Sequence, residues 1–313
     1  NLVELNISDN ELTSLPNSLG KLRRLQQLQL QRNNLHDLPE GLSKLTRLTY
    51  LNVRSNKLLS LPESVGQLSN LQQLSMRDNL LRTLPNSIGD LKRLQILDVQ
   101  ANRLTNLPTS IGKLENLQSL TLRDNSYLKS LPVEIGKLVN LQSLDLSENS
   151  LNTIPGQLGN LNKLQTLDLS FNQLSVLPRE FWGMKDLQIL SIEGNRLARL
   201  PDSIGRLANL QSLNLRENKL VSLPEGIGNL SKLRVLDLYD NRLNKLPASI
   251  GKLLSLQNLD LFNNQLEELP PEIGLLTNLQ EIDLKSNKLI TLPSEIGRLN
   301  RLQDLDLSGN KLE

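Results

Sequence analysis

Leucine and other aliphatic residues recur along the whole chain at fixed positions between polar residues. One unit, residues 25–39, reads LxxLxLxxNxLxxLP. Leu28 and Leu30 alternate with polar neighbours, which is the period of a strand with one buried face. The pattern therefore predicts one short strand in every unit, with the intervening residues facing solvent.

The asparagine of this unit recurs fourteen times, at intervals of 23 residues except for 24 between Asn125 and Asn149. An asparagine side chain both donates and accepts hydrogen bonds, so stacked asparagines can satisfy free backbone groups of adjacent coils. Losing one would leave buried polar groups unpaired, at about 1–3 kcal/mol. The predicted ladder comprises Asn33, Asn56, Asn79, Asn102, Asn172, Asn195, Asn218, Asn241, Asn264 and Asn287.

Proline and glycine punctuate the segment that follows each asparagine. Thirteen of the 14 prolines come directly after a leucine or isoleucine in the same part of the unit. Proline has no N–H to donate, so it ends any strand or helix that would run through it. The Ile-Gly pairs that follow, such as Ile88-Gly89, allow close backbone approach or a positive φ on the outer side.

A single unit buries too little apolar surface to offset the entropy lost on ordering it. Stacked units bury a continuous aliphatic core, so the repeats predict a curved α/β solenoid. We expect a parallel sheet on its concave face and short helical or irregular segments on its convex face. Residues 1–313 are expected to form one domain of about fourteen repeats. No capping segment is evident at either end, so we expect the domain to be part of a larger protein.

The pattern LPxxIGxLxxLxxLxLxxN resembles the leucine-rich-repeat family over the entire chain. It is similar to the form found in bacterial and intracellular Ras-group members of that family. The LxGxIP form of plant receptor ectodomains is absent. The resemblance implies a horseshoe that binds a protein partner on its concave side.

Composition narrows the possible chemistry. The chain has no cysteine and a single histidine, His36, so neither a zinc site nor a cysteine nucleophile is expected. No phosphate-binding loop or serine-histidine-aspartate motif occurs. We therefore predict no enzyme activity, no cofactor and no metal. No apolar run is long enough to span a membrane, and no basic face carries aromatic residues, so neither membrane insertion nor nucleic-acid binding is expected.

Charge is distributed unevenly when the repeats are aligned on their asparagines. The four columns expected on the inner face hold six basic and seventeen acidic residues, although the whole chain is close to neutral. An acidic inner face would steer a basic partner towards it. We therefore predict a protein partner with a basic surface.

Two groups of residues stand out on this inner face. Arg54, Arg77 and Arg123 share one column, and arginine is frequent at binding hot spots. Tyr239 and Phe262 follow one another in the same column and are flanked by aspartates. The alternative interpretation of the arginines is a solvated stripe paired with nearby acids. The alternative for the aromatic pair is that exposed aromatic residues on ordinary Leu-Asp-Leu strands are neutral for binding. The predicted protein-binding residues are Arg54, Arg77, Arg123, Phe171, Arg216, Asp237, Tyr239, Asp260 and Phe262.

Two repeats depart from the pattern. Trp182 occupies a position that is usually glycine, beside Phe181, where it is either an aromatic plug of the outer core or a second contact point. The extra residue near Ser126 and Tyr127 is interpreted as a structural insertion that bulges at the turn.

These features predict a protein-binding scaffold, in the cytoplasm, in signalling or as the recognition part of a larger protein. An extracellular ligand-binding ectodomain is one alternative. The other is the substrate-recognition domain of an enzyme whose catalytic part lies outside this chain. The oligomeric state is left open.

Overall fold

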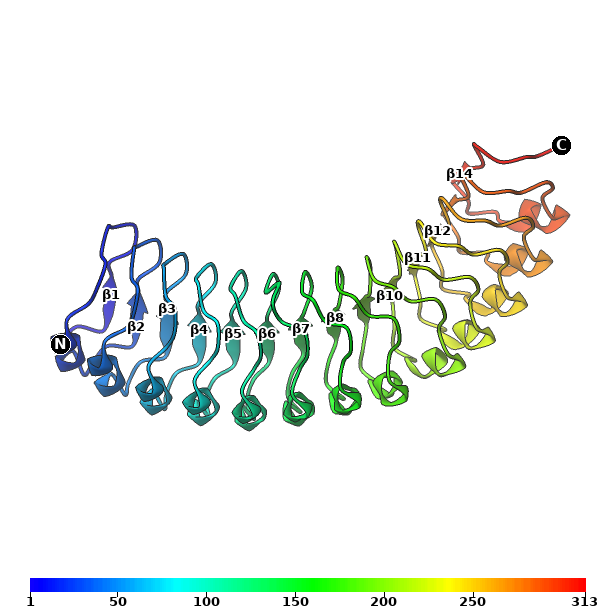
Figure 1. Ribbon diagram of the computed structural model, residues 1–313. Helices are drawn as coiled ribbons and strands as arrows, with labels where there is room; N and C mark the ends of the chain where they lie inside the picture. The colour runs from blue at the N-terminus through cyan, green and yellow to red at the C-terminus, as the bar shows by residue number, and fades with distance from the viewer. The chain divides into compact units, whose positions relative to one another are not determined.

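The computed structural model describes residues 1–313, which form two compact units, Asn1–Leu164 and Gln165–Glu313. In each unit, three-residue strands alternate with five-residue 3-10 helices along a stack of coils (Figure 1). The predicted repeat solenoid with a parallel sheet and short helical segments is confirmed. None of the 3-10 helices has the length or apolarity needed to cross a membrane.

Within each unit the strands pair in parallel with their sequence neighbours, and the register advances by one repeat, so that Leu5 lies opposite Leu28 and Leu28 opposite Leu51. The first unit contains β1 (Glu4–Asn6), β2 (Gln27–Gln29), β3 (Tyr50–Asn52), β4 (Gln73–Ser75), β5 (Ile96–Asp98), β6 (Ser119–Thr121) and β7 (Ser143–Asp145). The second contains β8 (Thr166–Asp168), β9 (Ile189–Ser191), β10 (Ser212–Asn214), β11 (Val235–Asp237), β12 (Asn258–Asp260), β13 (Glu281–Asp283) and β14 (Asp304–Asp306).

Every 3-10 helix begins directly after a proline, whose φ lies between −65° and −82°. The proline therefore ends the extended segment and also sets the φ that leads into the helix. The first unit contains η1 (Asn17–Lys21), η2 (Glu40–Lys44), η3 (Glu63–Gln67), η4 (Asn86–Asp90), η5 (Thr109–Lys113), η6 (Val133–Lys137) and η7 (Gly156–Asn160). The second contains η8 (Arg179–Gly183), η9 (Asp202–Arg206), η10 (Glu225–Asn229), η11 (Ala248–Lys252), η12 (Pro271–Leu275) and η13 (Ser294–Arg298).

The repeated asparagines from Asn33 to Asn287 are buried and join neighbouring coils. The Oδ1 atom of Asn195 accepts the N–H of Leu174 at 2.9 Å. Its Nδ2 donates to the carbonyls of Leu169 at 3.0 Å and Ile192 at 3.1 Å, one in the preceding coil and one in its own. The side chain of Asn195 therefore satisfies three backbone groups that would otherwise be buried without partners.

The residue before each repeated asparagine is left-handed, a feature that the sequence pattern did not predict. All fourteen such residues have φ between 50° and 71°, and only Gly194 and Gly309 are glycine. A non-glycine residue in this region is disfavoured by roughly 1–2 kcal/mol. The asparagine bonds that follow this turn hold it in place.

The outer glycines serve a different purpose. Of the two roles considered for them, the structure supports close approach. A Cβ atom added to Gly89 would lie 2.3 Å from the carbonyl oxygen of Ser110 in the next coil, and one added to Gly228 would lie 2.5 Å from that of Ser249. Positive φ occurs instead at the turn before the ladder asparagine.

The 24-residue repeat is accommodated at its turn. Asn149 Oδ1 accepts the N–H of Asn125 itself at 3.0 Å. In the regular coils the corresponding Oδ1 atom accepts the N–H of the residue two positions after the preceding ladder asparagine, as Asn125 Oδ1 does from Leu104. The extra residue is thus absorbed as a bulge, and it leaves Tyr127 58% exposed.

Candidate protein-binding surface

Four side chains from consecutive coils of the second unit stack in a row, two residues beyond the ends of β10 to β13. The guanidinium carbon of Arg216 lies 4.4 Å from the ring centroid of Tyr239. The rings of Tyr239 and Phe262 are 5.1 Å apart, and Lys285 Nζ lies 5.5 Å from the Phe262 centroid. These separations suit aromatic pairs and cation–π contacts. We call Arg216, Tyr239, Phe262 and Lys285 the stacked row.

A row of aspartates runs beside it. Asp237, Asp260, Asp283 and Asp306, the acid row, are the last residues of β11 to β14. Each carboxylate accepts the backbone N–H two residues later, at 2.8–3.1 Å. Asn52 and Asn214 make the same bond at 3.0 Å in other coils. The bond therefore needs an acceptor and no charge, so the negative charge of four successive aspartates is surplus to the fold.

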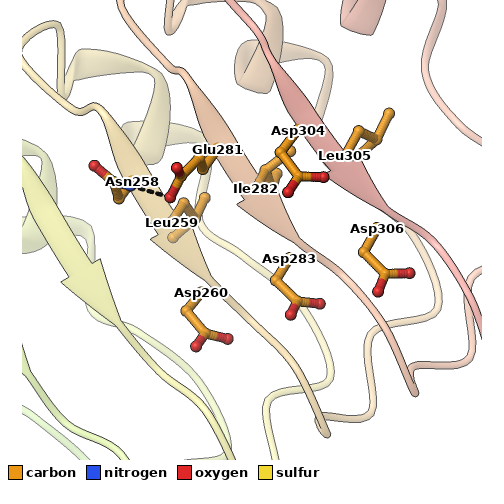
Figure 2. Close-up of a pocket in the computed structure, with 9 residues that line it drawn as sticks. All are labelled: Asn258, Leu259, Asp260, Glu281, Ile282, Asp283, Asp304, Leu305 and Asp306. Atoms are coloured by element: carbon orange, nitrogen blue, oxygen red, sulfur yellow. Dashed lines mark hydrogen bonds between the residues drawn. The ribbon is translucent and has the colours of Figure 1, made fainter.

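The acid row opens into a hollow of about 420 Å³ over β12 to β14 (Figure 2). Asp260, Asp283 and Asp306 line one part of it, and Glu281 and Asp304 line another. None of these five carboxylates forms an ion pair. They also do not converge as a group that could hold a metal ion. The hollow is thus a predominantly anionic surface open to an extended cationic ligand.

Burial and charge shift the pKa values where the two rows meet. Burial raises the pKa of Asp260 above its ordinary value, and the neighbouring Asp283 carboxylate raises it further. Burial likewise raises the pKa of Asp237, with a contribution from Asp260, although Arg216 opposes it. Arg216 is held between Asp237, at 3.1 Å, and Glu193, at 3.9 Å. Its pKa is raised because these carboxylates outweigh its burial.

The structure brings together five of the nine residues predicted to bind a partner, namely Arg216, Asp237, Tyr239, Asp260 and Phe262. Tyr239 and Phe262 are half-buried because each ring packs on its neighbours in the row.

The other four predicted residues lie outside this cluster. Arg123 pairs with Glu148 at 2.5 Å, while Arg54 and Arg77 form no ion pair. Phe171 is 46% exposed, and its ring lies over Gly194, where an added Cβ would come within 2.5 Å of it.

Several members of this surface were not among the residues predicted to bind a partner. Lys285 completes the stacked row, and Asp283, Asp306, Glu281 and Asp304 complete the hollow. Lys285, Asp283 and Asp306 occupy the same columns as residues that were chosen, whereas Glu281 and Asp304 begin their strands, in a column from which no residue was chosen. What the columns lacked was the information on which carboxylates already have a cationic partner.

Comparisons with known proteins agree with this architecture. A family model described as a leucine-rich repeat region matches residues 1–80, 133–222 and 222–313. A leucine-rich-repeat protein of Leptospira interrogans superposes with a TM-score of 0.86 at 38% identity, covering 98% of this chain and 84% of that one. No curated protein is recognisably similar.

Two further solved structures are more distant. An internalin of Listeria monocytogenes gives a TM-score of 0.73 at 22% identity, over 100% of this chain and 82% of that one, which supports the fold alone. The plant peptide hormone receptor RGFR1, solved in complex with RGF2, gives 0.54 at 31% identity, over 99% of this chain and 64% of that one.

Proposed function

The chain belongs to the leucine-rich-repeat family, and on that premise we propose that its second unit recognises a basic segment of a partner protein. Proteins of this family typically act as non-catalytic binding scaffolds. The observation that carries the proposal is the hollow of five unpaired carboxylates beside the stacked row.

The two rows contribute different parts of the interaction. The carboxylates of Asp260, Asp283 and Asp306 attract lysine or arginine side chains, and their summed field steers a basic segment to the surface. A single exposed ion pair contributes little, about 0–1 kcal/mol. Tyr239 and Phe262 add apolar area that a partner can cover, because each ring remains partly exposed. Affinity therefore requires both rows.

The cations of the stacked row are already in use. Arg216 is paired with Asp237 and lies over Tyr239, and Lys285 lies over Phe262. They hold the two rings in place, and Arg216 pairs with Asp237 at the near end of the acid row. At the far end, over β13 and β14, the charge of Lys285 acts on Asp306, but no carboxylate forms an ion pair there.

The plant receptor structure contains a bound peptide hormone, which supports a polypeptide segment as the ligand for this fold. An intracellular signalling scaffold and the recognition part of a larger protein both fit such an activity. An extracellular receptor would use the surface in the same way.

The proposal is tested with a fluorescein-labelled octapeptide of alternating arginine and glycine, and with its glutamate counterpart. Fluorescence anisotropy should show binding of the arginine peptide alone. Tyr239→Ala combined with Phe262→Ala should weaken this binding at least about tenfold, as expected for aromatic anchors.

The matched control is Arg54→Ala combined with Arg77→Ala, which alters the same column in the first unit. Lys113→Ala, in η5, controls for a change on the helical side. Both controls should leave affinity within about twofold of the parent chain. Equal weakening by the aromatic and control variants would refute the proposal.

A further inference from the structure

Two coils depart from the repeat, and only one of these departures changes the surface. In the second unit Trp182 is buried edge-on against Phe181, with 5.0 Å between the ring centroids, so the predicted aromatic plug is present. In the first unit the bulge at the 24-residue repeat leaves Tyr127 exposed, and Tyr127 lines a hollow of about 300 Å³. This volume lies at the lower end of the range for small-ligand sites. The other lining residues are Arg82, Arg103 and Thr105, and all four are exposed to solvent.

The hollow is basic and lacks a counter-charge. Three successive turns, residues 80–83, 103–106 and 126–130, contain three basic residues and no acidic one. The side chains of Arg82 and Arg103 form no ion pair, although acidic residues precede the ladder asparagines of two of these coils. Arg82 is the only arginine that lies three residues after a repeated asparagine. The repeat itself therefore does not require this charge.

Backbone hydrogen bonds hold the two arginines in adjacent coils. The Arg103 N–H donates to the Leu81 carbonyl at 2.9 Å, and the Thr105 N–H donates to the Arg82 carbonyl at 3.0 Å. The Thr105 hydroxyl donates to the same carbonyl at 3.4 Å, so the donors left for a ligand are the guanidiniums and the Tyr127 hydroxyl. Two guanidiniums that line one hollow repel each other, and an anion that pairs with both offsets this repulsion.

The donors identify the class of anion. A carboxylate has two oxygens, and a single guanidinium satisfies both of them in a bidentate pair. A phosphate monoester has three terminal oxygens and a charge of about −1.5 to −2 at pH 7, so it can pair with both guanidiniums at once. The exposed ring of Tyr127 adds an apolar face on which an aromatic group can stack. The complementary ligand is therefore an aromatic phosphate.

We propose that this hollow binds a phosphate monoester carried on an aromatic ring, with Arg82 and Arg103 holding the phosphate and Tyr127 packing against the ring. Phosphotyrosine and small aromatic phosphates share this group. The hollow lies within the first unit and shares no residue with the stacked row or the acid row. It is therefore independent of the proposed function, and either can fail without the other.

Saturation-transfer NMR tests the site with three probes that carry the same ring, namely phenyl phosphate, benzoate and phenol. Phenyl phosphate should bind with a dissociation constant on the order of 1 mM, because exposed charges hold small ligands weakly. Benzoate and phenol should bind at least about tenfold more weakly, since benzoate engages one guanidinium and phenol is uncharged. Binding of either benzoate or phenol as strong as that of phenyl phosphate would overturn the proposal.

A fourth probe, N-acetyl-phosphotyrosine amide, distinguishes the two sources of the aromatic phosphate. Binding tighter than that of phenyl phosphate would support a phosphorylated polypeptide as the ligand, because the peptide groups then add contacts. Equal or weaker binding would support a small aromatic phosphate.

Variants locate the binding in this hollow. Arg82→Gln combined with Arg103→Gln changes two exposed residues, so it should leave the circular-dichroism spectrum unchanged while weakening phenyl phosphate at least about tenfold. The matched control, Arg54→Gln combined with Arg77→Gln, removes two other arginines of the first unit that form no ion pair. It should alter affinity by less than about twofold. Equal weakening by the two double variants would indicate a general attraction of anions and would overturn the proposal.

The tyrosine has its own test. Tyr127→Ala should weaken phenyl phosphate at least about threefold, because the stacking surface is lost. Binding of inorganic phosphate, measured by phosphorus NMR, should be unchanged in this variant. An unchanged affinity for phenyl phosphate would contradict the role of the ring.

Discussion

The two units of the chain have the same interior and different surfaces. Their strands, 3-10 helices and asparagine bonds repeat with little change. The units differ in charge at four positions of each repeat, namely the first and third residues of the strand and the two residues before the asparagine. At these positions the first unit has four basic and seven acidic residues. The second has two basic and ten acidic residues in the same columns. The comparison shows that the core constrains these columns weakly, so they are free to encode recognition.

The use of the cations differs as well. In the first unit Arg32 pairs with Asp9 and Arg123 with Glu148, each at 2.5 Å, which neutralises charge locally. In the second unit Arg216 and Lys285 lie against aromatic rings and leave most of the acid row without a partner. We therefore expect substitutions in the interior to change the stability of both units equally. Substitutions at the four variable positions of each repeat should change binding in one unit and not in the other.

The first prediction, which has the largest expected effect, tests the interior that the two units share. Asn102→Ala in the first unit and Asn195→Ala in the second each remove three hydrogen bonds to buried backbone groups. Each should lower the free energy of unfolding by about 3 kcal/mol. Urea denaturation followed by circular dichroism measures this loss.

Asn106→Ala, at an exposed position, is the control and should change stability by less than about 0.5 kcal/mol. A loss confined to one of the two ladder variants would show that the units do not have equivalent interiors.

The interior could be predicted from the sequence because it repeats. Leucine spacing predicts the positions of the strands, and the regular asparagines predict the ladder. The left-handed turn could not be predicted in this way. Its position holds residues as different as Arg32, Phe171 and Asn263, so no residue preference reveals the positive φ.

The surface could be predicted only in part. Consecutive aromatic residues in one column indicated that Tyr239 and Phe262 would be neighbours, and they are. Whether a charged side chain is free or paired depends on rotamers and on cross-strand contacts, which column alignment does not contain. For that reason Arg123 was grouped with Arg54, although in the structure it is bound to Glu148.

The second prediction addresses the difference in charge. Asp260→Asn combined with Asp283→Asn removes two charges from the hollow and keeps an acceptor for the turn, as Asn214 does. Binding of the arginine peptide should weaken about tenfold with the fold unchanged. Asp98→Asn combined with Asp145→Asn is the matched change in the first unit and should alter affinity by less than about twofold. Equal effects would remove the distinction between the units.

The third prediction uses pH, with a smaller effect. Asp237 and Asp260 have pKa values raised above the ordinary 3.8, so they take up protons at a higher pH than exposed aspartates do. Binding of the arginine peptide should therefore fall about threefold as the pH drops towards these raised values, because protonation of Asp260 removes a charge from the hollow that the peptide occupies. The same proton uptake favours the folded state over the unfolded one, so stability should not fall for this reason. Isothermal titration at several pH values measures the effect, and Asp260→Asn should flatten the profile.

The smallest expected effect returns to the turn that the two units share. Ala101 and Ser286 both have a φ of 53°, which a Cβ atom disfavours by roughly 1–2 kcal/mol. Replacing either by glycine relieves this strain and adds entropy to the unfolded chain, which offsets about 0.4–1 kcal/mol of the gain. Ala101→Gly and Ser286→Gly should each raise stability by about 0.5 kcal/mol. Ala208→Gly, where φ is not positive, should lower it by a similar amount, because only the entropic term remains. The opposite signs of these stability changes separate backbone strain from chain entropy. Loss of stability in both Ala101→Gly and Ser286→Gly would mean that the asparagine bonds already compensate for the strain in both units.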